Sequence, residues 1–223
     1  MKATAIKSNG KDPFQEITEQ RNEATLKLRR LAKARLEVEI VGLTSVIPHR
    51  WSEKSLLMMR DKQTGSKVKS VKEPKKPEAE AEASLYRLPD GRPGMPATAF
   101  KSALTGASRF FDGVTMVMLT QLLFVEGEGP EHLVPITGTL HMREDTPRLA
   151  TGVVDLRYRY EIRDWSAVLV VRFVPSLIDS ESIIALADAA GMGGVGDWRP
   201  SSPKSLTGVY GTWAVKEKEV DDD

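Results

Sequence analysis

Apolar and polar residues alternate along two segments of the chain, as they do in strands that bury one face. In RLEVEIVGLTSVI, the apolar residues Leu36, Val38 and Ile40 alternate with Glu37 and Glu39, which predicts a half-buried strand. VVDLRYRYEI repeats this pattern, with an apolar face of Val154, Leu156, Tyr158, Tyr160 and Ile162 and a polar face of Asp155, Arg157, Arg159, Glu161 and Arg163. The run AVLVVRFV that follows is typical of a central strand. Asp164-Trp165 is expected to form a tight connection between these two strands.

Apolar residues recur at helical spacing in two other segments. The first begins at Ala97 and predicts a helix that ends near Phe110. In the second, Asp179 is placed to cap a helix that Gly191 ends, with one apolar side made of Ile183, Ile184, Ala187 and Ala190. Ser52 is placed to cap a short helix over EKSLLMMRD, and residues 19–33 are rich in helix formers.

The predicted elements follow one another in a recognisable order. Residues 120–141 hold two short strand candidates, QLLFVEG and LVPITGTL, and the last candidate is TGVYGTWAV. Without insertions, the order is β-α-β-β-α-β, which is the α+β pattern of the ferredoxin-like, or RRM-like, fold. This fold hosts many functions, so the order alone indicates none.

The chain is expected to form a single domain over residues 21–216. Residues 1–20 have no periodicity and are predicted to be a flexible arm, and residues 217–223 an acidic, solvated tail. Residues 62–83 are low in complexity, basic in the first half and acidic in the second. Because they offer almost nothing to bury, they are expected to form a mobile insertion.

Composition and charge narrow the class of protein. Among 223 residues, 32 basic and 31 acidic side chains leave a net charge of +1, so a nucleic-acid surface requires local segregation of charge. Without cysteine, there is no disulfide, thiolate nucleophile or cysteine zinc site. The N-terminus lacks the apolar region of a secretory signal, and no apolar run is long enough for a membrane span. We expect a soluble, cytoplasmic protein with no membrane partner.

The sequence GMGGVG at Gly191–Gly196 matches the dinucleotide-binding pattern G-x-G-x-x-G. That site requires a strand before the first glycine and a helix after the last. Here a predicted helix precedes the glycines, and Pro200 and Pro203 exclude a regular helix after them. A dinucleotide site is therefore excluded.

Two interpretations of the glycine-rich segment stay open. Gly191 can be a helix C-cap whose neighbours only form a flexible connection. Alternatively, the backbone amides of Gly193–Gly196 and Arg199 contact phosphates while Trp198 stacks on a base.

A glycine-rich loop between the last helix and last strand of a ferredoxin-like fold resembles the RAMP superfamily, the RNA-binding backbone subunits of CRISPR effector complexes. The segment Gly94–Leu104, in which Lys101 follows a glycine and a proline, resembles the start of that family's first helix. The insertion at residues 62–83 corresponds in position to the protruding thumb of such proteins. The ending GDWRP, followed by two further glycines, also resembles phage-encoded proteins of this size. The resemblance implies a single-stranded RNA or DNA partner and self-assembly into an oligomer or filament along the strand, in the host cytoplasm if the protein is phage-encoded.

Arginines on the predicted strand face offer a second candidate for phosphate contact. Arg157, Arg159 and Arg163 share that face, and Arg143 and Arg148 precede it. The alternative is a solvated face on which Asp155 and Glu161 pair with the arginines. Tyr158 and Tyr160 are expected in the core, whereas Trp165 and Trp51, the latter after His49-Arg50, are expected to be exposed aromatics.

No pattern predicts catalysis, a cofactor or a resident metal. The three histidines lack metal-ligand spacing, and no serine or lysine lies in a nucleophile motif. The pair Glu144-Asp145 leaves a metal-dependent ribonuclease open as an alternative, beside a phage structural or host-interaction protein without nucleic-acid affinity. The predicted nucleic-acid-binding residues are His49, Arg50, Lys101, Arg143, Arg148, Arg157, Arg159, Gly193, Gly194, Gly196, Trp198 and Arg199.

Overall fold

The computed structural model describes residues 30–65, 74–147, 152, 154–203 and 207–216. Its main sheet has the order β4-β7-β1-β8 with antiparallel neighbours, formed by β1 (Ala34–Gly42), β4 (Phe124–Glu126), β7 (Arg157–Phe173) and β8 (Trp213–Val215). Between β1 and β4 the chain forms α4 (Ala97–Gly106), and between β7 and β8 it forms α6 (Ser180–Gly193). Strand order and connections are those of the predicted ferredoxin-like α+β fold, which is confirmed.

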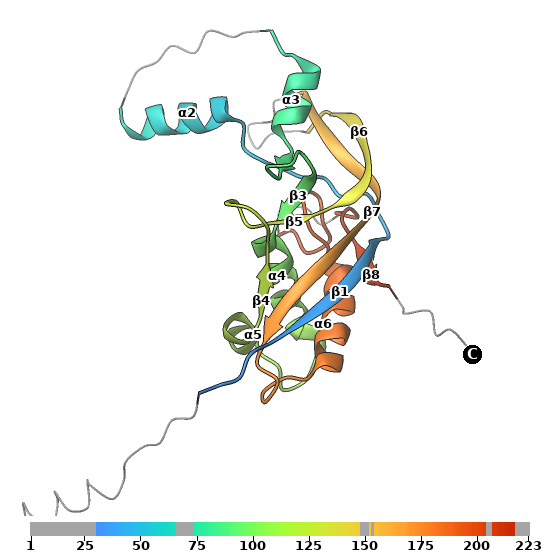
Figure 1. The fold of residues 1–223 in the computed structure, drawn as a ribbon. Coiled ribbons are helices and arrows are strands. Elements are labelled where there is room, and N and C mark those ends of the chain that lie inside the picture. Colours follow the sequence, from blue (N-terminus) through green and yellow to red (C-terminus); the bar gives the residue numbers. More distant parts are fainter. Residues whose placement is uncertain (1–29, 66–73, 148–151, 153, 204–206, 217–223) are drawn as a thin grey trace, which may run out of the picture. The chain divides into compact units, whose positions relative to one another are not determined.

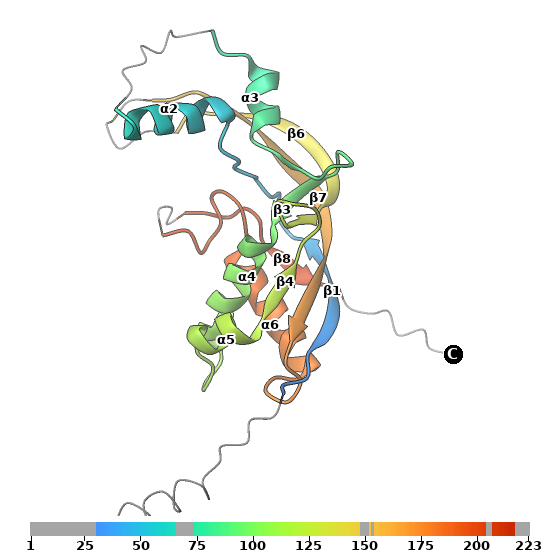
Figure 2. The same ribbon diagram turned by 60° about the vertical axis from the view of Figure 1, so that its left-hand side comes forward.

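Helices α4 and α6 cover the same face of this sheet (Figures 1 and 2). The alternation predicted for β1 is confirmed, because Val38 and Ile40 are buried beneath the helices while Glu37 and Glu39 are exposed. The core centres on three aromatic side chains from different elements. The ring of Trp213 lies 5.9 Å from that of Phe100 and 6.4 Å from that of Trp165, in edge-to-face arrangements.

The remaining elements attach to this core. A small antiparallel sheet joins β2 (Tyr86–Arg87), β3 (Pro93–Pro96) and β5 (Leu133–Pro135). A single turn, η1 (Ala107–Phe110), extends α4 as far as the predicted helix, and α5 (Met116–Leu122) follows it. The predicted caps are confirmed, because Ser52 caps α2 (Glu53–Gln63) and Asp179 caps α6. None of the described helices combines the length and apolar character needed to span a membrane.

The predicted tight connection at Asp164-Trp165 is wrong. β7 continues through it as one strand of 17 residues, pairing first with β6 (Thr137–Asp145) and then with β1. The register shift opposite β6 and the positive φ of Asp164 (47°) mark a bulge instead of a turn. Trp165 was also wrongly expected to be exposed. It is fully buried, and its indole Nε1 donates a hydrogen bond of 2.7 Å to the carbonyl oxygen of Thr44.

The insertion predicted at residues 62–83 is partly structured. Its final third forms α3 (Pro77–Ala83), which lies beside β6 and β7 (Figures 1 and 2) and buries Ala81 completely. A proline at the first helical position and two glutamates in the first turn favour this helix locally. The predicted flexible arm at residues 1–20 and the acidic tail at 217–223 lie outside the described residues.

Candidate functional site

The described part of the segment between α6 and β8, here called the glycine loop (residues 194–203 and 207–212), folds back on itself and on the segment after β1. Val195 N–H donates to Gly211 O (3.0 Å), and Asp197 N–H donates to Ile47 O (2.9 Å). The predicted end of α6 at Gly191 is wrong by two residues. The helix runs to Gly193, and the C-cap is Gly194, whose positive φ of 66° suits a residue without a side chain.

At most glycines of this loop, backbone atoms of other residues lie so close that a side chain would not fit. A Cβ atom on Gly211 would lie 1.9 Å from Val195 O, and one on Gly208 would lie 2.4 Å from Trp198 O. The amides of Gly194 and Val195 donate within the protein, so their expected use for phosphate is wrong in this conformation. Within the described chain, the amides of Gly196, Trp198 and Arg199 have no hydrogen-bond acceptor. Three amides of the loop are therefore left to donate hydrogen bonds to an anion.

Two of the predicted arginines belong to a network of ion pairs behind the loop. Arg159 is 4% exposed and donates to Asp145 (2.7 Å) and to Asp197. Arg143 donates to Asp145 (2.8 Å) and to Glu161 (2.7 Å). Arg163 also pairs with Glu161 at 2.6 Å, so three guanidinium groups meet three carboxylates and leave no surplus positive charge for a phosphate.

This network corrects the predicted solvated face of β7. Arg159 and Glu161 are buried within the network, whereas Val154, predicted on the buried face, is 57% exposed. The aromatic rings of Trp198 and Tyr210 lie over the network. The guanidinium carbon of Arg143 lies 4.9 Å from the ring centre of Tyr210, and that of Arg159 lies 4.6 Å from the ring centre of Trp198.

The other predicted basic residues are dispersed. Lys101 lies over the ring of Phe124 at 4.3 Å, at the edge strand β4. Arg157 pairs with Asp155 at 3.0 Å, as expected for local pairing, and Arg50 pairs with Glu131 at 3.0 Å. Arg148 lies outside the described residues.

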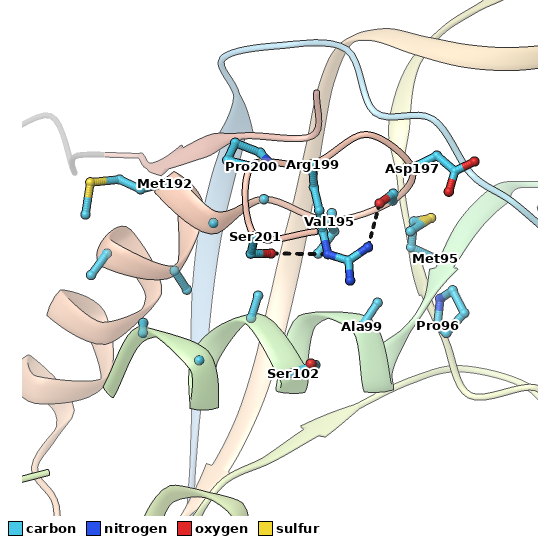
Figure 3. Close-up of a pocket in the computed structure, with 18 of the residues that line it drawn as sticks. Met95, Pro96, Ala99, Ser102, Met192, Val195, Asp197, Arg199, Pro200 and Ser201 are labelled. Atoms are coloured by element: carbon cyan, nitrogen blue, oxygen red, sulfur yellow. Dashed lines mark hydrogen bonds between the residues drawn. The ribbon is translucent and has the colours of Figure 1, made fainter. Parts of the chain in front are cut away.

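His49, Gly193, Gly194, Gly196 and Arg199 do come together, around a cavity of about 530 Å³. The cavity lies between α4, the end of α6 and the glycine loop (Figure 3). Arg199 points from the loop toward α4, and its guanidinium donates to Gly196 O (3.0 Å) and Ser201 Oγ (3.2 Å). A volume of this size is typical of a pocket for one small ligand or one unit of a polymer.

Sequence reasoning missed Asp197 and Tyr86, which also line this cavity. Asp197 Oδ2 accepts a hydrogen bond from Arg159 and lies 2.7 Å from His49 Nδ1. The Tyr86 hydroxyl donates to His49 O at 3.3 Å. The only sequence signal for Asp197 was its position beside Trp198 and Arg199. Its two partners are distant along the chain, so pattern alone could not identify them.

Of the pair Glu144-Asp145, on which the alternative of a metal-dependent ribonuclease was based, Glu144 is exposed but Asp145 is occupied by arginines. Asp145 is 6% exposed, and both of its carboxylate oxygens accept hydrogen bonds from arginine. Among the residues that the structure describes, no group of three or more acidic, histidine or cysteine side chains is arranged to hold a metal ion. Metal binding at Asp145 would require breaking these buried ion pairs.

The position of Asp197 predicts how stability changes in acid. Burial raises the pKa of Asp197, but hydrogen bonds from His49 and Arg159 outweigh burial, so the pKa lies below its ordinary value. A carboxyl with a depressed native pKa stabilises the fold above the unfolded pKa of about 3.9, and this contribution is lost as the pH falls further. We expect Asp197→Asn to reduce the loss of stability between about pH 5 and about pH 3.

Urea unfolding at these two pH values measures the effect. Asp164→Asn, which changes an exposed carboxylate on β7, is the control and should retain the wild-type loss. An equal loss of stability in wild type and Asp197→Asn would contradict the prediction.

Among the comparisons with known proteins, only the comparison with solved structures found similar proteins. No protein-family model matches the sequence, and no curated protein matches it. One similar structure is a chain in "Cryo-EM structure of the Type III-B Cmr-beta bound to cognate target RNA", with 12% identity and a TM-score of 0.42. The match covers 92% of this chain and 63% of that one, so this chain spans less than two thirds of its length. Another is Cmr6 from Pyrococcus furiosus, with 10% identity and a TM-score of 0.39, covering 84% and 100% of the two chains.

Proposed function

We propose that the protein binds single-stranded nucleic acid, with its phosphates held by the glycine loop. The main observation behind this proposal is that the charge of Arg199 is not neutralised by a carboxylate among the described residues. Its guanidinium touches only a backbone carbonyl and a hydroxyl, and within the described residues it has no ion pair with a carboxylate. A guanidinium held in place but not neutralised is suited to bidentate contact with phosphate.

Backbone donors beside Arg199 support the same ligand. The amides of Gly196, Trp198 and Arg199 lack acceptors in the described chain, and Gly196 and Trp198 both have positive φ, at 81° and 54°. Trp198 and Arg199 are adjacent, and two free amides at and after a left-handed residue can form a concave donor surface that binds anions. Arginine and amides together suit one phosphate of a polymer backbone.

The outer face of the main sheet is a poorer candidate for the nucleic-acid surface. RRM-type recognition stacks bases on aromatic residues of that face. On β1 the outward side chains are Arg35, Glu37, Glu39 and Val41, and Arg35 is paired with Glu126. Carboxylates at these positions repel a phosphate backbone, so the glycine loop is the better site.

Fluorescence anisotropy with labelled single-stranded RNA, single-stranded DNA and duplex over a salt series tests the proposal. We expect Arg199→Ala to weaken single-strand binding about tenfold or more and to reduce the salt dependence by about one ion. Arg199→Lys should recover only part of the affinity, because lysine cannot make the bidentate contact.

Arg92→Ala is the matched control, because Arg92 is exposed but already pairs with Asp90 and Glu128 at 2.7 Å each. It should bind like wild type. Absence of binding to all three nucleic acids at low salt would refute the proposal and leave the structural or host-interaction protein as the alternative.

RNA is favoured over DNA because of the sequence resemblance to the RAMP superfamily, and a phage origin and host-cytoplasmic location rest on the sequence alone. Self-assembly along the strand gains support from α2, where four consecutive apolar side chains, Leu56–Met59, are each 38–52% exposed. Apolar residues exposed in this way are typical of a contact surface.

A further inference from the structure

The cavity beside the glycine loop is larger than phosphate binding requires. Its volume is about 530 Å³, and a phosphate held by Arg199 and the loop amides would occupy only a part of it. Figure 3 shows the space between the Arg199 side chain and α4, on which Ala99 and Ser102 lie. Pockets of this volume enclose a group of small-molecule size, so a helix or a duplex does not fit.

One wall of the cavity is made of small residues of α4, and packing within the fold does not explain the glycine among them. Ala99, Ala103 and Gly106 line it from successive turns of α4. A Cβ atom on Gly106 would approach only Arg109 Nη2, at 3.8 Å, and Gly106 has helical dihedrals of −65° and −28°. Alanine would therefore fit here and favour the helix, so packing does not explain this glycine. By contrast, a Cβ on Gly191 would lie 1.9 Å from Trp213 O.

Polar groups lie at the edges of this apolar space. Arg199 is anchored by its two hydrogen bonds on the loop side, and Ser102 and Ser201 contribute hydroxyl groups. His49 is fixed at one end through its 2.7 Å contact with Asp197. Small apolar walls with a guanidinium and hydroxyls at the rim suit a flat aromatic ring that has hydrogen-bonding edges.

We propose that this cavity accepts one unpaired nucleobase of a strand bound by the glycine loop. The inference rests on the proposed function, because Arg199 would hold the phosphate next to the inserted base. The ring would lie along Ala99, Ala103 and Gly106, with its polar edge toward the serine hydroxyls. A single strand gives up a base from its stack at little cost, and every base has an aromatic face, so insertion requires no particular sequence.

Binding of two strands of equal length separates contact with the base from contact with the backbone. One strand is oligoadenylate RNA, and the other consists of abasic ribose-phosphate spacers. We expect wild type to bind the base-containing strand about tenfold more tightly. Ala103→Phe, which fills the cavity, should abolish this preference while leaving affinity for the spacer strand unchanged.

Two further variants keep the test interpretable. Thr98→Phe adds the same side chain to an exposed position of α4 that does not line the cavity, and it should keep the preference. Gly106→Leu fills the cavity from a position where the helix gains from the substitution, so it should melt no lower than wild type and lose the preference. Equal binding of both strands by wild type, or a preference retained in both filling variants, would overturn the base pocket alone. Failure of wild type to bind either strand would overturn the proposed function and the pocket with it.

Discussion

Replacing Arg159 with alanine is expected to lower the free energy of unfolding by about 3 kcal/mol. Arg159 is 4% exposed, and its guanidinium is shared by the carboxylates of Asp145 and Asp197. Removing one partner of a buried ion pair costs about 3–5 kcal/mol, because the other charge stays buried without compensation. The lower end of that range applies here, since Arg143 still hydrogen-bonds Asp145 and His49 still contacts Asp197.

Urea unfolding measures the change, with Arg163→Ala as the matched control. Arg163 lies on the same strand and pairs with Glu161 at 2.6 Å, but its side chain is 48% exposed. Its replacement should cost less than about 1 kcal/mol. If Arg159→Ala unfolds like wild type yet loses nucleic-acid affinity, Arg159 serves the ligand and not the fold, as the sequence pattern first predicted.

Gly191→Ala is expected to destabilise the protein by about 3 kcal/mol, at the upper end of the usual cost of overpacking. Gly191 is buried where α6 packs against β8, and a Cβ atom there would lie 1.9 Å from Trp213 O. This overlap is with backbone, so a side-chain rotation cannot relieve it. Relief requires α6 and β8 to separate, which would also weaken the packing around the Trp213 ring.

Thermal unfolding provides the measurement, with an expected fall of roughly 6–12 °C in Tm. Gly106→Ala is the matched control, because Gly106 is also a helical glycine near a helix end, but a Cβ there would meet only Arg109 Nη2, at an ordinary contact distance of 3.8 Å. It should raise stability by about 0.5–1 kcal/mol, through the helix propensity of alanine. A similar response in the two variants would show that the contact with Trp213 does not restrict Gly191.

Helices and strands whose signals come from residues close together in the sequence were predicted correctly. The alternation around Val38 and Ile40 gave β1, and Asp179 marked the start of α6 because a side-chain cap acts within three residues. The order of these elements was sufficient for the ferredoxin-like fold.

Features made by distant residues could not be predicted in this way. Arg159 is buried because of Asp145 and Asp197, which lie 14 and 38 positions away, and no local pattern indicates such pairs. Trp165 is buried because β7 passes through a bulge where a turn was expected. At the candidate site, the sequence pattern identified the loop glycines. It could not show which of them are required for close packing, because that depends on atoms of other residues, such as Val195 O near Gly211.

The central position of β1 has a consequence for how the chain folds. β1 is the first described strand to be synthesised, yet it pairs with β7 and β8, which are the last two described strands in chain order. Just beyond it, the hydroxyls of Thr44 and Thr212 meet at 2.8 Å although 168 positions separate them. Contacts of such high sequence separation slow folding, because a long loop must close before they form. During translation, one edge of β1 therefore stays unpaired until β7 has been made and the other until β8 has been made, and in that interval β1 is open to aggregation or chaperone binding.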